Sequence, residues 1–139
     1  MESFLSIDEV ARRTGLTAHT LRYYERIGLI APVGRAAGGQ RRYAASDMAW
    51  IEFLLRLRTT HMPIGMMQTF ATLRGAGDST VPQRRQMLEQ HLTAVLAQIK
   101  AMRQSAAALQ TKIVHYRSIE QSLAPTSTSD KPKEKNVKP

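Results

Sequence analysis

The sequence predicts a mainly α-helical protein in which a winged helix-turn-helix is followed by one long helix. Two short capped segments lie close together near the N-terminus, a Gly-rich loop between extended segments follows them, and a heptad repeat fills much of the second half. The chain of 139 residues is long enough for one small domain and an extension. We expect a domain at residues 1–75, a linker at 76–81, a coiled-coil helix at 82–120 and a disordered basic tail at 121–139.

The first two predicted helices are delimited by capping residues. Ser6 and Glu9 form a capping box at the start of the first helix, and Gly15 ends it. Thr17 caps the second helix, which runs from Ala18 to Ile27. The short turn between the two helices matches helix-turn-helix geometry.

The segment after the second helix predicts a two-stranded wing. Leu29-Ile30 and Arg41-Arg42-Tyr43 are expected to be short extended segments, and residues 34–40 form a flexible loop between them. A hairpin this small is only marginally stable by itself, so we expect the wing to pack against the helices.

Two more helices complete the predicted domain. Ser46 is expected to cap a third helix that runs from Asp47 to about Thr60. Pro63 opens a fourth helix, Ile64 to about Leu73, at the first helical position, where proline is tolerated.

The long helix after Pro82 carries a heptad repeat, in which apolar residues alternate at spacings of four and three. A helix from Gln83 to Ser118 would be roughly 54 Å long at 1.5 Å per residue. It cannot bury its apolar stripe against so small a domain, so we expect a partner helix, most simply that of a second copy. The predicted dimer contacts are Leu88, Leu92, Val95, Ile99, Met102, Ala106, Leu109, Ile113 and Tyr116.

Arginine is concentrated near the N-terminus. The chain has 20 Lys+Arg and 11 Asp+Glu, a formal net charge of +9. Between Arg12 and Arg42 lie seven arginines and one acid, Glu25, a local net charge of +6. This excess favours polyanions, nucleic acid first and an anionic membrane surface second. We interpret the second helix and the wing as one surface for double-stranded DNA.

The second helix supplies most of the predicted DNA contacts. His19 and Thr20 lie in its first turn, where base edges are usually met, and Ala18 suits a thymine methyl group. Arg22 suits a phosphate or a guanine edge, and the alternative is a surface ion pair with Glu25 or Glu9. The full predicted set is Thr17, Ala18, His19, Thr20, Arg22, Tyr23, Tyr24, Arg35, Arg41, Arg42 and Tyr43.

The aromatic residues of this set have structural alternatives. Tyr23 is expected to offer its hydroxyl to a phosphate, whereas Tyr24 fits either the interface or the core. Arg41 and Arg42 are expected to follow phosphates or the minor groove, with Arg35 as a mobile contact. Tyr43 fits equally well as a staple between wing and core.

Several function classes are disfavoured by the composition. The chain has no cysteine, which removes disulfides and thiolate metal sites. Its four histidines lie far apart in the sequence and no H-E-x-x-H or nucleophile–base arrangement occurs, so we expect no enzyme, no metal and no cofactor. No stretch is apolar enough to span a bilayer or act as a signal peptide, and we expect a cytoplasmic protein.

The N-terminal half of the chain contains three motifs and one acid: Ser6-x-x-Glu9-x-Ala11, Thr20-Leu21-Arg22-Tyr23-Tyr24-Glu25-Arg26-Ile27-Gly28-Leu29, Gln40-Arg41-Arg42-Tyr43 and Asp47. Together they resemble the N-terminal region of MerR-family transcription regulators, and the resemblance is continuous over about residues 4–75. The resemblance implies an antiparallel coiled-coil homodimer on a pseudo-palindromic promoter. It also implies that the protein bends and untwists an over-long promoter spacer so that RNA polymerase can engage both recognition elements.

The departures from the family pattern concern the signal. Metal-responsive members use cysteines, which this chain lacks, and a subgroup that senses electrophiles often has a cysteine where this chain has Arg56. Drug-sensing members add a large C-terminal domain, and here only a short tail follows the heptads. The resemblance therefore implies a signal that does not act on thiols.

A small apolar effector is one such signal. In the family architecture the fourth helix lies near the coiled coil of the other subunit, and the adaptable side chains Met62, Met66, Met67 and Phe70 could line a pocket there. The alternative is ordinary core filling. Trp50 is expected on the buried side of the third helix, with a place in an effector cage as its alternative.

Two other functions fit the same sequence. One is a DNA-architectural or recombination accessory protein that uses the same winged helix. The other is a small-molecule-binding or scaffold protein in which the coiled coil is the active part.

Overall fold

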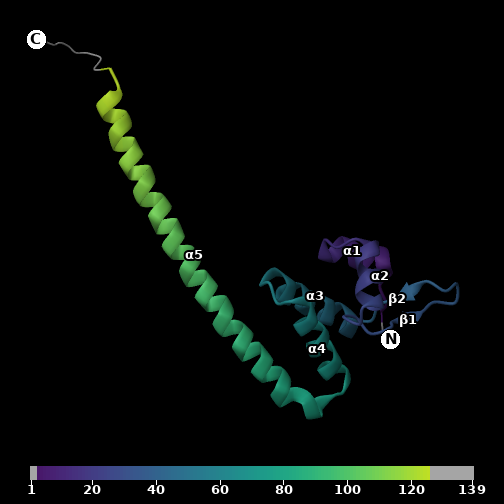
Figure 1. Ribbon diagram of the computed structural model, residues 1–139. Coiled ribbons are helices and arrows are strands. Elements are labelled where there is room, and N and C mark those ends of the chain that lie inside the picture. The colour runs from purple at the N-terminus through teal and green to yellow at the C-terminus, as the bar shows by residue number, and fades with distance from the viewer. Residues whose placement is uncertain (1–2, 126–139) are drawn as a thin grey trace, which may run out of the picture. The chain divides into compact units, whose positions relative to one another are not determined.

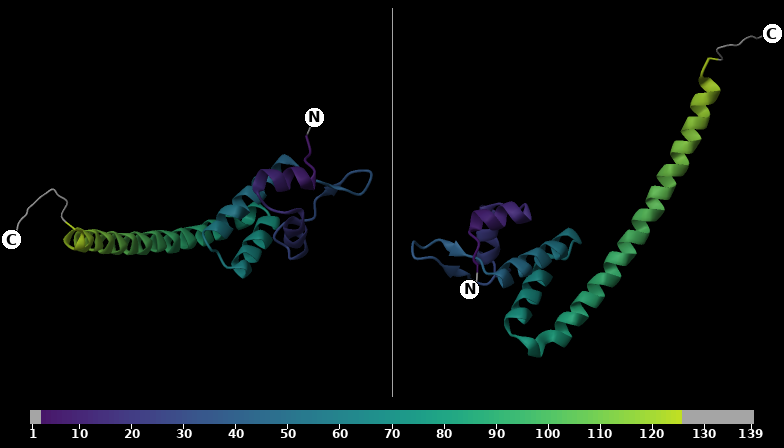
Figure 2. Two further views of the ribbon diagram at one scale, coloured as in Figure 1. Left: turned by 90° about the horizontal axis from the view of Figure 1, so that it is seen from above. Right: turned by 180° about the vertical axis from the view of Figure 1, so that it is seen from behind.

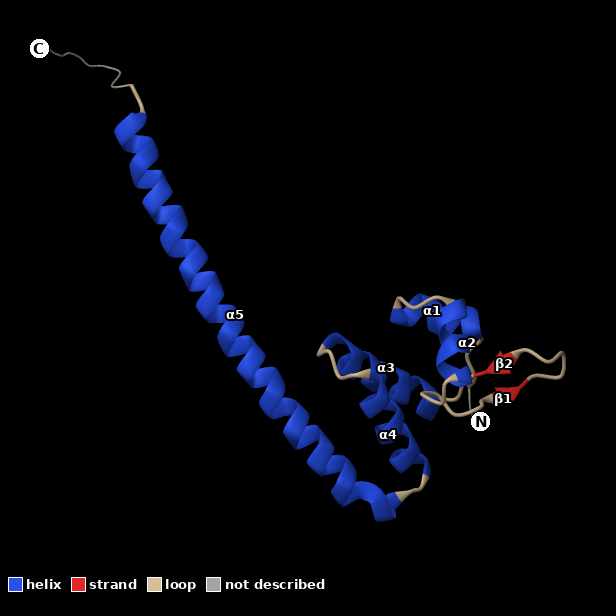
Figure 3. Ribbon diagram, viewed as in Figure 1, coloured by secondary structure: helices blue, strands red, loops and turns tan. Residues whose placement is uncertain are grey.

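The computed structural model describes residues 3–125, which are mainly helical (Figures 1 and 3). Contacts divide the described residues into two units, with the boundary between Val95 and Leu96. The elements in chain order are α1 (Ile7–Thr14), α2 (Ala18–Arg26), β1 (Gly34–Arg35), β2 (Arg41–Arg42), α3 (Ala45–Thr59), α4 (Ile64–Gly75), the 3-10 helix η1 (Asp78–Thr80) and α5 (Val81–Leu123).

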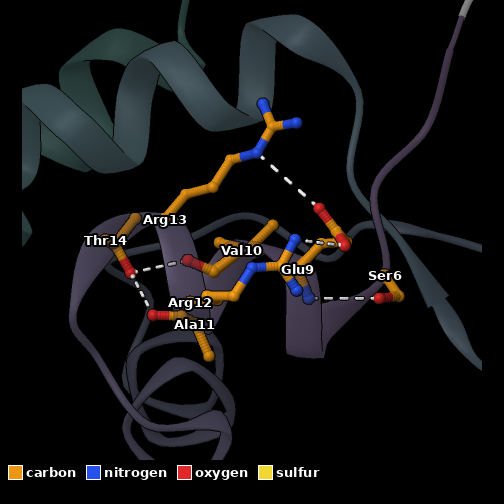
Figure 4. A network of polar contacts seen from close by, with 7 residues as sticks. All are labelled: Ser6, Glu9, Val10, Ala11, Arg12, Arg13 and Thr14. Atoms are coloured by element: carbon orange, nitrogen blue, oxygen red, sulfur yellow. Dashed lines mark hydrogen bonds and ion pairs between the residues drawn. The ribbon is translucent and has the colours of Figure 1, made fainter.

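The helix-turn-helix begins and ends where the capping residues predict. The Ser6 hydroxyl accepts a hydrogen bond from the Glu9 backbone N–H at 3.1 Å (Figure 4). Gly15 takes a left-handed conformation with φ of 77° and closes α1. The Thr17 hydroxyl accepts from the Thr20 N–H at 3.0 Å and opens α2. The predicted end of α2 at Ile27 is one residue too long.

The wing differs from its prediction in the first strand. β1 is Gly34–Arg35, paired antiparallel with β2, whereas the predicted strand Leu29-Ile30 is not in the sheet. The backbone N–H groups of Leu29 and Ile30 both donate to the Tyr24 carbonyl, at 2.9 and 3.2 Å. These residues therefore satisfy the C-terminal end of α2, and their side chains are buried.

The wing is attached to the domain through the N-terminal segment. Leu5 and Tyr43 form an antiparallel bridge, with N–H to carbonyl distances of 2.8 Å in both directions. The hairpin loop projects away from the helices in both further views (Figure 2). Since the tip has little support of its own, the bridge and the buried Tyr43 side chain fix the base of the wing.

The start of α3 was also mispredicted. Ala44, not Ser46, is the N-cap, and the Asp47 carboxylate accepts a hydrogen bond from the Ala44 N–H at 2.8 Å. α4 begins at Ile64 as predicted and extends to Gly75, but Pro63 is its N-cap and not its first helical residue. Within the predicted linker 76–81, η1 forms and the Thr80 side chain is buried, so this connection is ordered structure.

The core of the first unit lies among α1–α4 and the segment after α2. Its largest completely buried side chains include Tyr43, Leu21, Leu29 and Ile51. Trp50 is buried and its indole N–H donates to the Leu29 carbonyl at 2.8 Å. The predicted core position of Trp50 is therefore confirmed.

α5 is a continuous helix of 43 residues, or roughly 65 Å at 1.5 Å per residue. It continues three residues past the predicted boundary at 120, and the rest of the predicted tail, from 126 onward, lies outside the described residues. Apolar side chains stay exposed along it, for example Met102 at 71% and Leu109 at 67%. No helix in residues 3–125 is long and apolar enough to cross a membrane.

Candidate nucleic-acid interface

The exposed face of α2 carries the polar residues predicted to contact DNA. His19, Arg22 and Tyr23 are exposed, and Ala18 and Thr20 are partly exposed. The Thr17 hydroxyl caps the helix and also donates to the Thr20 hydroxyl at 2.9 Å. Thr17 thus holds the first turn of α2, where Ala18 and His19 lie, in a fixed geometry.

Arg22 does not form the ion pairs considered as its alternative role. Glu9 pairs with Arg12 at 2.6 Å, and Glu25 pairs with Arg41 at 2.8 Å. Among the described residues, Arg22 therefore has no acidic partner. Its guanidinium group is available for an anion from outside the domain.

A basic hollow lies between α2 and the wing. It has a volume of about 290 Å³ and is lined by Arg22, Glu25, Arg26, Pro32 and Arg41. Three guanidinium groups face one carboxylate there, which leaves a net positive charge. Such a hollow favours a phosphate group over a cation.

The Arg41 prediction needs a correction. Its Nε donates to Glu25 at 2.8 Å, and the two side chains are only 20% and 14% exposed. Arg41 therefore ties the wing to α2 and is not a free phosphate contact. The sequence hid this pair, because the two residues are 16 positions apart on different elements.

For Tyr24 and Tyr43 the structure shows the core alternative and not the DNA contact. Tyr24 is 6% exposed and Tyr43 is completely buried, so both rings belong to the core and do not offer a face to DNA. Burial raises the pKa of the Tyr43 hydroxyl, which stays neutral at physiological pH. Tyr23 is 40% exposed and the Arg26 guanidinium lies 5.3 Å from its ring centroid.

The exposed basic side chains of the wing are Arg35 and Arg42. Arg35 donates to the Gly39 carbonyl at 2.9 Å, across the hairpin loop. The Arg42 guanidinium lies 4.0 Å from the ring centroid of Phe4, a stacking partner that the sequence did not reveal. Both cations are therefore held by local contacts while they face the surroundings.

α1 adds arginines that sequence reasoning did not assign to the interface. Arg12 and Arg13 both approach the Glu9 carboxylate, at 2.6 and 3.7 Å (Figure 4). The hydrogen bond from Arg12 lowers the pKa of Glu9. Glu9 therefore compensates part of the positive charge of α1, whereas Arg22 of α2 and Arg35 and Arg42 of the wing have no acidic partner among the described residues.

The predicted effector residues are mostly core. Met62, Met67 and Phe70 are 4% exposed, and Met66 is 37% exposed. Core filling therefore accounts for three of the four. Phe70 also lines an open hollow beside α3, whose other walls include none of the three methionines.

The described histidines and acids lie apart from one another. Among residues 3–125 no three His, Cys, Asp or Glu side chains come together as metal ligands. His91, in the third turn of α5, forms a hydrogen bond of 2.7 Å with the hydroxyl of Thr60, the residue that ends α3.

Comparisons with known proteins agree with this geometry. The model of the family described as "MerR family regulatory protein" matches residues 6–43, which span the helix-turn-helix and the wing. The regulator AdhR of Bacillus subtilis is 45% identical over 84 residues, and the match covers 60% of each chain, less than two thirds of that relative. An uncharacterized HTH-type transcriptional regulator of Haemophilus influenzae is 31% identical over 109 residues, which are 78% of this chain and 81% of the relative.

Two solved structures extend the similarity over most of the chain. HiNmlR, a MerR-family regulator lacking the sensor domain, was crystallised bound to promoter DNA; it is 29% identical, with a TM-score of 0.77 over 87% of this chain and 94% of its own. A regulator from Listeria monocytogenes, described as a putative member of the family, is 31% identical, with a TM-score of 0.78 over 86% and 93%. Together these matches show that the chain belongs to the MerR family of DNA-binding transcription regulators, which are not enzymes.

Proposed function

We propose that two copies of this chain bind a pseudo-palindromic promoter, each through α2 and its wing, and control transcription by distorting an over-long spacer in response to a signal that does not act on thiols. The observation that carries the proposal is the set of unpaired, exposed cations on α2 and the wing, with Arg22 at the centre. The DNA-bound structure of the similar regulator HiNmlR supports it.

In this proposal α2 lies in the major groove. His19 and Thr20 in its first turn meet base edges, and Ala18 contacts a thymine methyl group. Arg22 binds a phosphate or a guanine edge from the rim of the basic hollow. Arg42 and Arg35 on the wing contact the adjacent backbone or the minor groove.

The homodimer forms along α5. The predicted contact residues of α5 include large apolar side chains that are exposed in the single chain, for example Ile99 at 42%, Leu109 at 67% and Tyr116 at 57%. Burying each such side chain is worth about 1.5–3 kcal/mol, so a stripe of this length supports a stable pair. A two-fold pair presents two copies of α2 to two half-sites.

The output is a change in DNA shape at the promoter. Bending or untwisting a spacer costs deformation energy, which two clamped half-sites can supply. RNA polymerase then engages both of its recognition elements. The signal is non-thiol because the whole sequence lacks cysteine.

Sedimentation equilibrium tests the dimer. Leu109→Asp places a charge on the apolar stripe and should dissociate the pair, whereas Val114→Asp, at a 55% exposed apolar residue off the stripe, should not. A dimer unaffected by Leu109→Asp contradicts the role of the stripe.

DNase footprinting across the genome tests the regulatory role. We expect protection of one or a few promoters over two half-sites, with hypersensitive cleavage in the spacer that reports its distortion. Dispersed, bent sites outside promoters would favour an architectural protein, and no protection would favour the scaffold function.

A further inference from the structure

An open hollow beside α3 combines aromatic rings with arginines. It has a volume of about 420 Å³, and every residue that lines it belongs to the first compact unit. Three rings, of Trp50, Phe53 and Phe70, form its apolar wall, and Arg74 and Arg84 contribute the cations. We call this site the aromatic hollow.

The three rings pack against one another. Trp50 and Phe70 are stacked, with centroids 5.9 Å apart and planes 3° apart. Phe53 lies 6.2 Å from Trp50 and 6.0 Å from Phe70, in tilted orientation. Trp50 and Phe70 are buried, whereas Phe53 is 37% exposed, so Phe53 is the ring that is open to a ligand and the other two support it. The exposed Phe53 ring suits a flat aromatic ring.

The two arginines are held in place without an acidic partner. The Arg74 guanidinium lies over the Trp50 ring, 4.5 Å from its centroid. Arg84 donates through Nε to the Thr80 hydroxyl at 3.0 Å and through a terminal nitrogen to the Gly77 carbonyl at 3.1 Å. No ion pair among residues 3–125 uses either arginine. The charge of the aromatic hollow is therefore positive and uncompensated.

We propose that the aromatic hollow binds a small aromatic carboxylate, whose ring packs on Phe53 beside Trp50 and whose carboxylate pairs with Arg74 and Arg84. The volume lies in the range of small-molecule sites, and the fork of a guanidinium matches a carboxylate. As an effector site this deepens the proposed function and rests on it, since it supplies the non-thiol signal.

The aromatic hollow is connected to α2 by a hydrogen bond and to the wing through the chain. The Trp50 indole N–H donates to the carbonyl of Leu29, three residues after the end of α2. Ser46, also in the lining, lies in the first turn of α3, three residues after Tyr43 of the wing bridge. A ligand in the hollow therefore lies against the helix that follows the wing and that is hydrogen-bonded to the segment after α2.

Trp50 is the only tryptophan in the chain, so one indole N–H signal in a proton–nitrogen correlation spectrum reports on this site. The probe is 1-naphthoate, added to the full-length protein, with 1-naphthalenemethanol as its neutral counterpart. We expect a saturable shift of the indole signal with 1-naphthoate, and at least about tenfold weaker binding of the neutral compound.

Two substitutions separate the arginine contribution from general effects of charge. Arg74→Gln, at an exposed residue, should weaken 1-naphthoate binding about tenfold, whereas Arg58→Gln, at an exposed arginine of α3 outside the hollow, should leave it unchanged. The remaining signals of the spectrum show whether each variant is folded. The proposal is overturned by an absent or non-saturating shift, by equal binding of the neutral compound, or by full affinity in Arg74→Gln.

A second measurement keeps this proposal distinct from the proposed function. The spectrum detects ligand binding in the absence of DNA. If the protein binds naphthoate but protects no promoter, the ligand site is supported and the proposed regulatory function is contradicted. If it protects a promoter but does not bind naphthoate, the regulatory function is supported and the ligand site is contradicted. If both hold, saturating 1-naphthoate should change promoter affinity in the wild type and not in Arg74→Gln.

Discussion

Replacing Glu25 by Gln removes one partner of the ion pair that joins α2 to the wing. The Glu25 and Arg41 side chains are 14% and 20% exposed, and their contact measures 2.8 Å. Exposed pairs contribute about 0.2–1 kcal/mol, whereas breaking a buried pair costs about 3–5 kcal/mol because it leaves an unpaired charge. For this partly buried pair we expect Glu25→Gln to lower the free energy of unfolding by about 1.5–2.5 kcal/mol.

The chain offers a matched control in the first turns of α5. Glu89 and Arg85 form the same kind of pair at 2.9 Å, but their side chains are 62% and 57% exposed. Glu89→Gln should therefore change the free energy of unfolding by less than about 0.5 kcal/mol. The two pairs differ in burial and in reach, since Glu25–Arg41 joins two elements and Arg85–Glu89 lies within one helix.

Urea unfolding at a fixed protomer concentration measures both effects. At a slope of about 1–3 kcal/mol per molar urea, Glu25→Gln should move the midpoint by about 1 M, and Glu89→Gln should barely move it. The double variant Glu25→Gln with Arg41→Gln should lose less than the sum of the single losses, because the unpaired charge is gone. Equal losses for Glu25→Gln and Glu89→Gln would refute the structural role of the wing pair.

Two further predictions concern α1 and α4. Gly15→Ala should destabilise the protein by about 1 kcal/mol, because φ is +77° at this residue. Gly65→Ala lies inside α4 with no atom near the added carbon, and it should stabilise the protein by about 0.5–1 kcal/mol. Thermal unfolding measures both changes, and the same sign of change for the two variants would contradict this prediction. The pKa of Glu9 is lower in the folded state than its unfolded value near 4.5, so the ionised Glu9 stabilises the folded state at pH values above 4.5. This contribution is lost as the pH falls through the folded pKa. Arg12→Ala should remove that part of the acid sensitivity in urea titrations at several pH values, and an unchanged pH profile would oppose it.

Features set by local chemistry were predictable from the sequence. The cap at Ser6, the stop at Gly15 and the cap at Thr17 each depend on residues a few positions apart, and the structure has all three. The same holds for the heptad stripe of α5, because its spacing alone fixes which residues share a face. The cap at Thr17 sets where α2 begins, and this fixes the face of the helix on which Arg22 lies, so its exposure was also predictable.

The errors arose where tertiary contacts decide. Leu29-Ile30 has the side chains of a strand, but its N–H groups satisfy the end of α2. For Tyr24 and Tyr43 the sequence left the interface and the core open, and the burial of both rings decides for the core. From the sequence alone Arg41 is expected to be an unpaired cation, but in the structure it forms an ion pair with Glu25. The sequence offered Trp50 and Phe70 as possible effector residues, but not their grouping with Phe53, Arg74 and Arg84, because the lining comes from three helices.

The claim that α2 presents Arg22 to DNA is tested by the salt dependence of promoter affinity. Each phosphate contact that is lost flattens the slope of log K against log salt by about 0.9, so Arg22→Ala should flatten it by about 1.8 per dimer and weaken binding. Lys100→Ala removes one exposed cation from α5 and should leave both quantities unchanged. Slopes and affinities that are the same for wild type, Arg22→Ala and Lys100→Ala would contradict the claim.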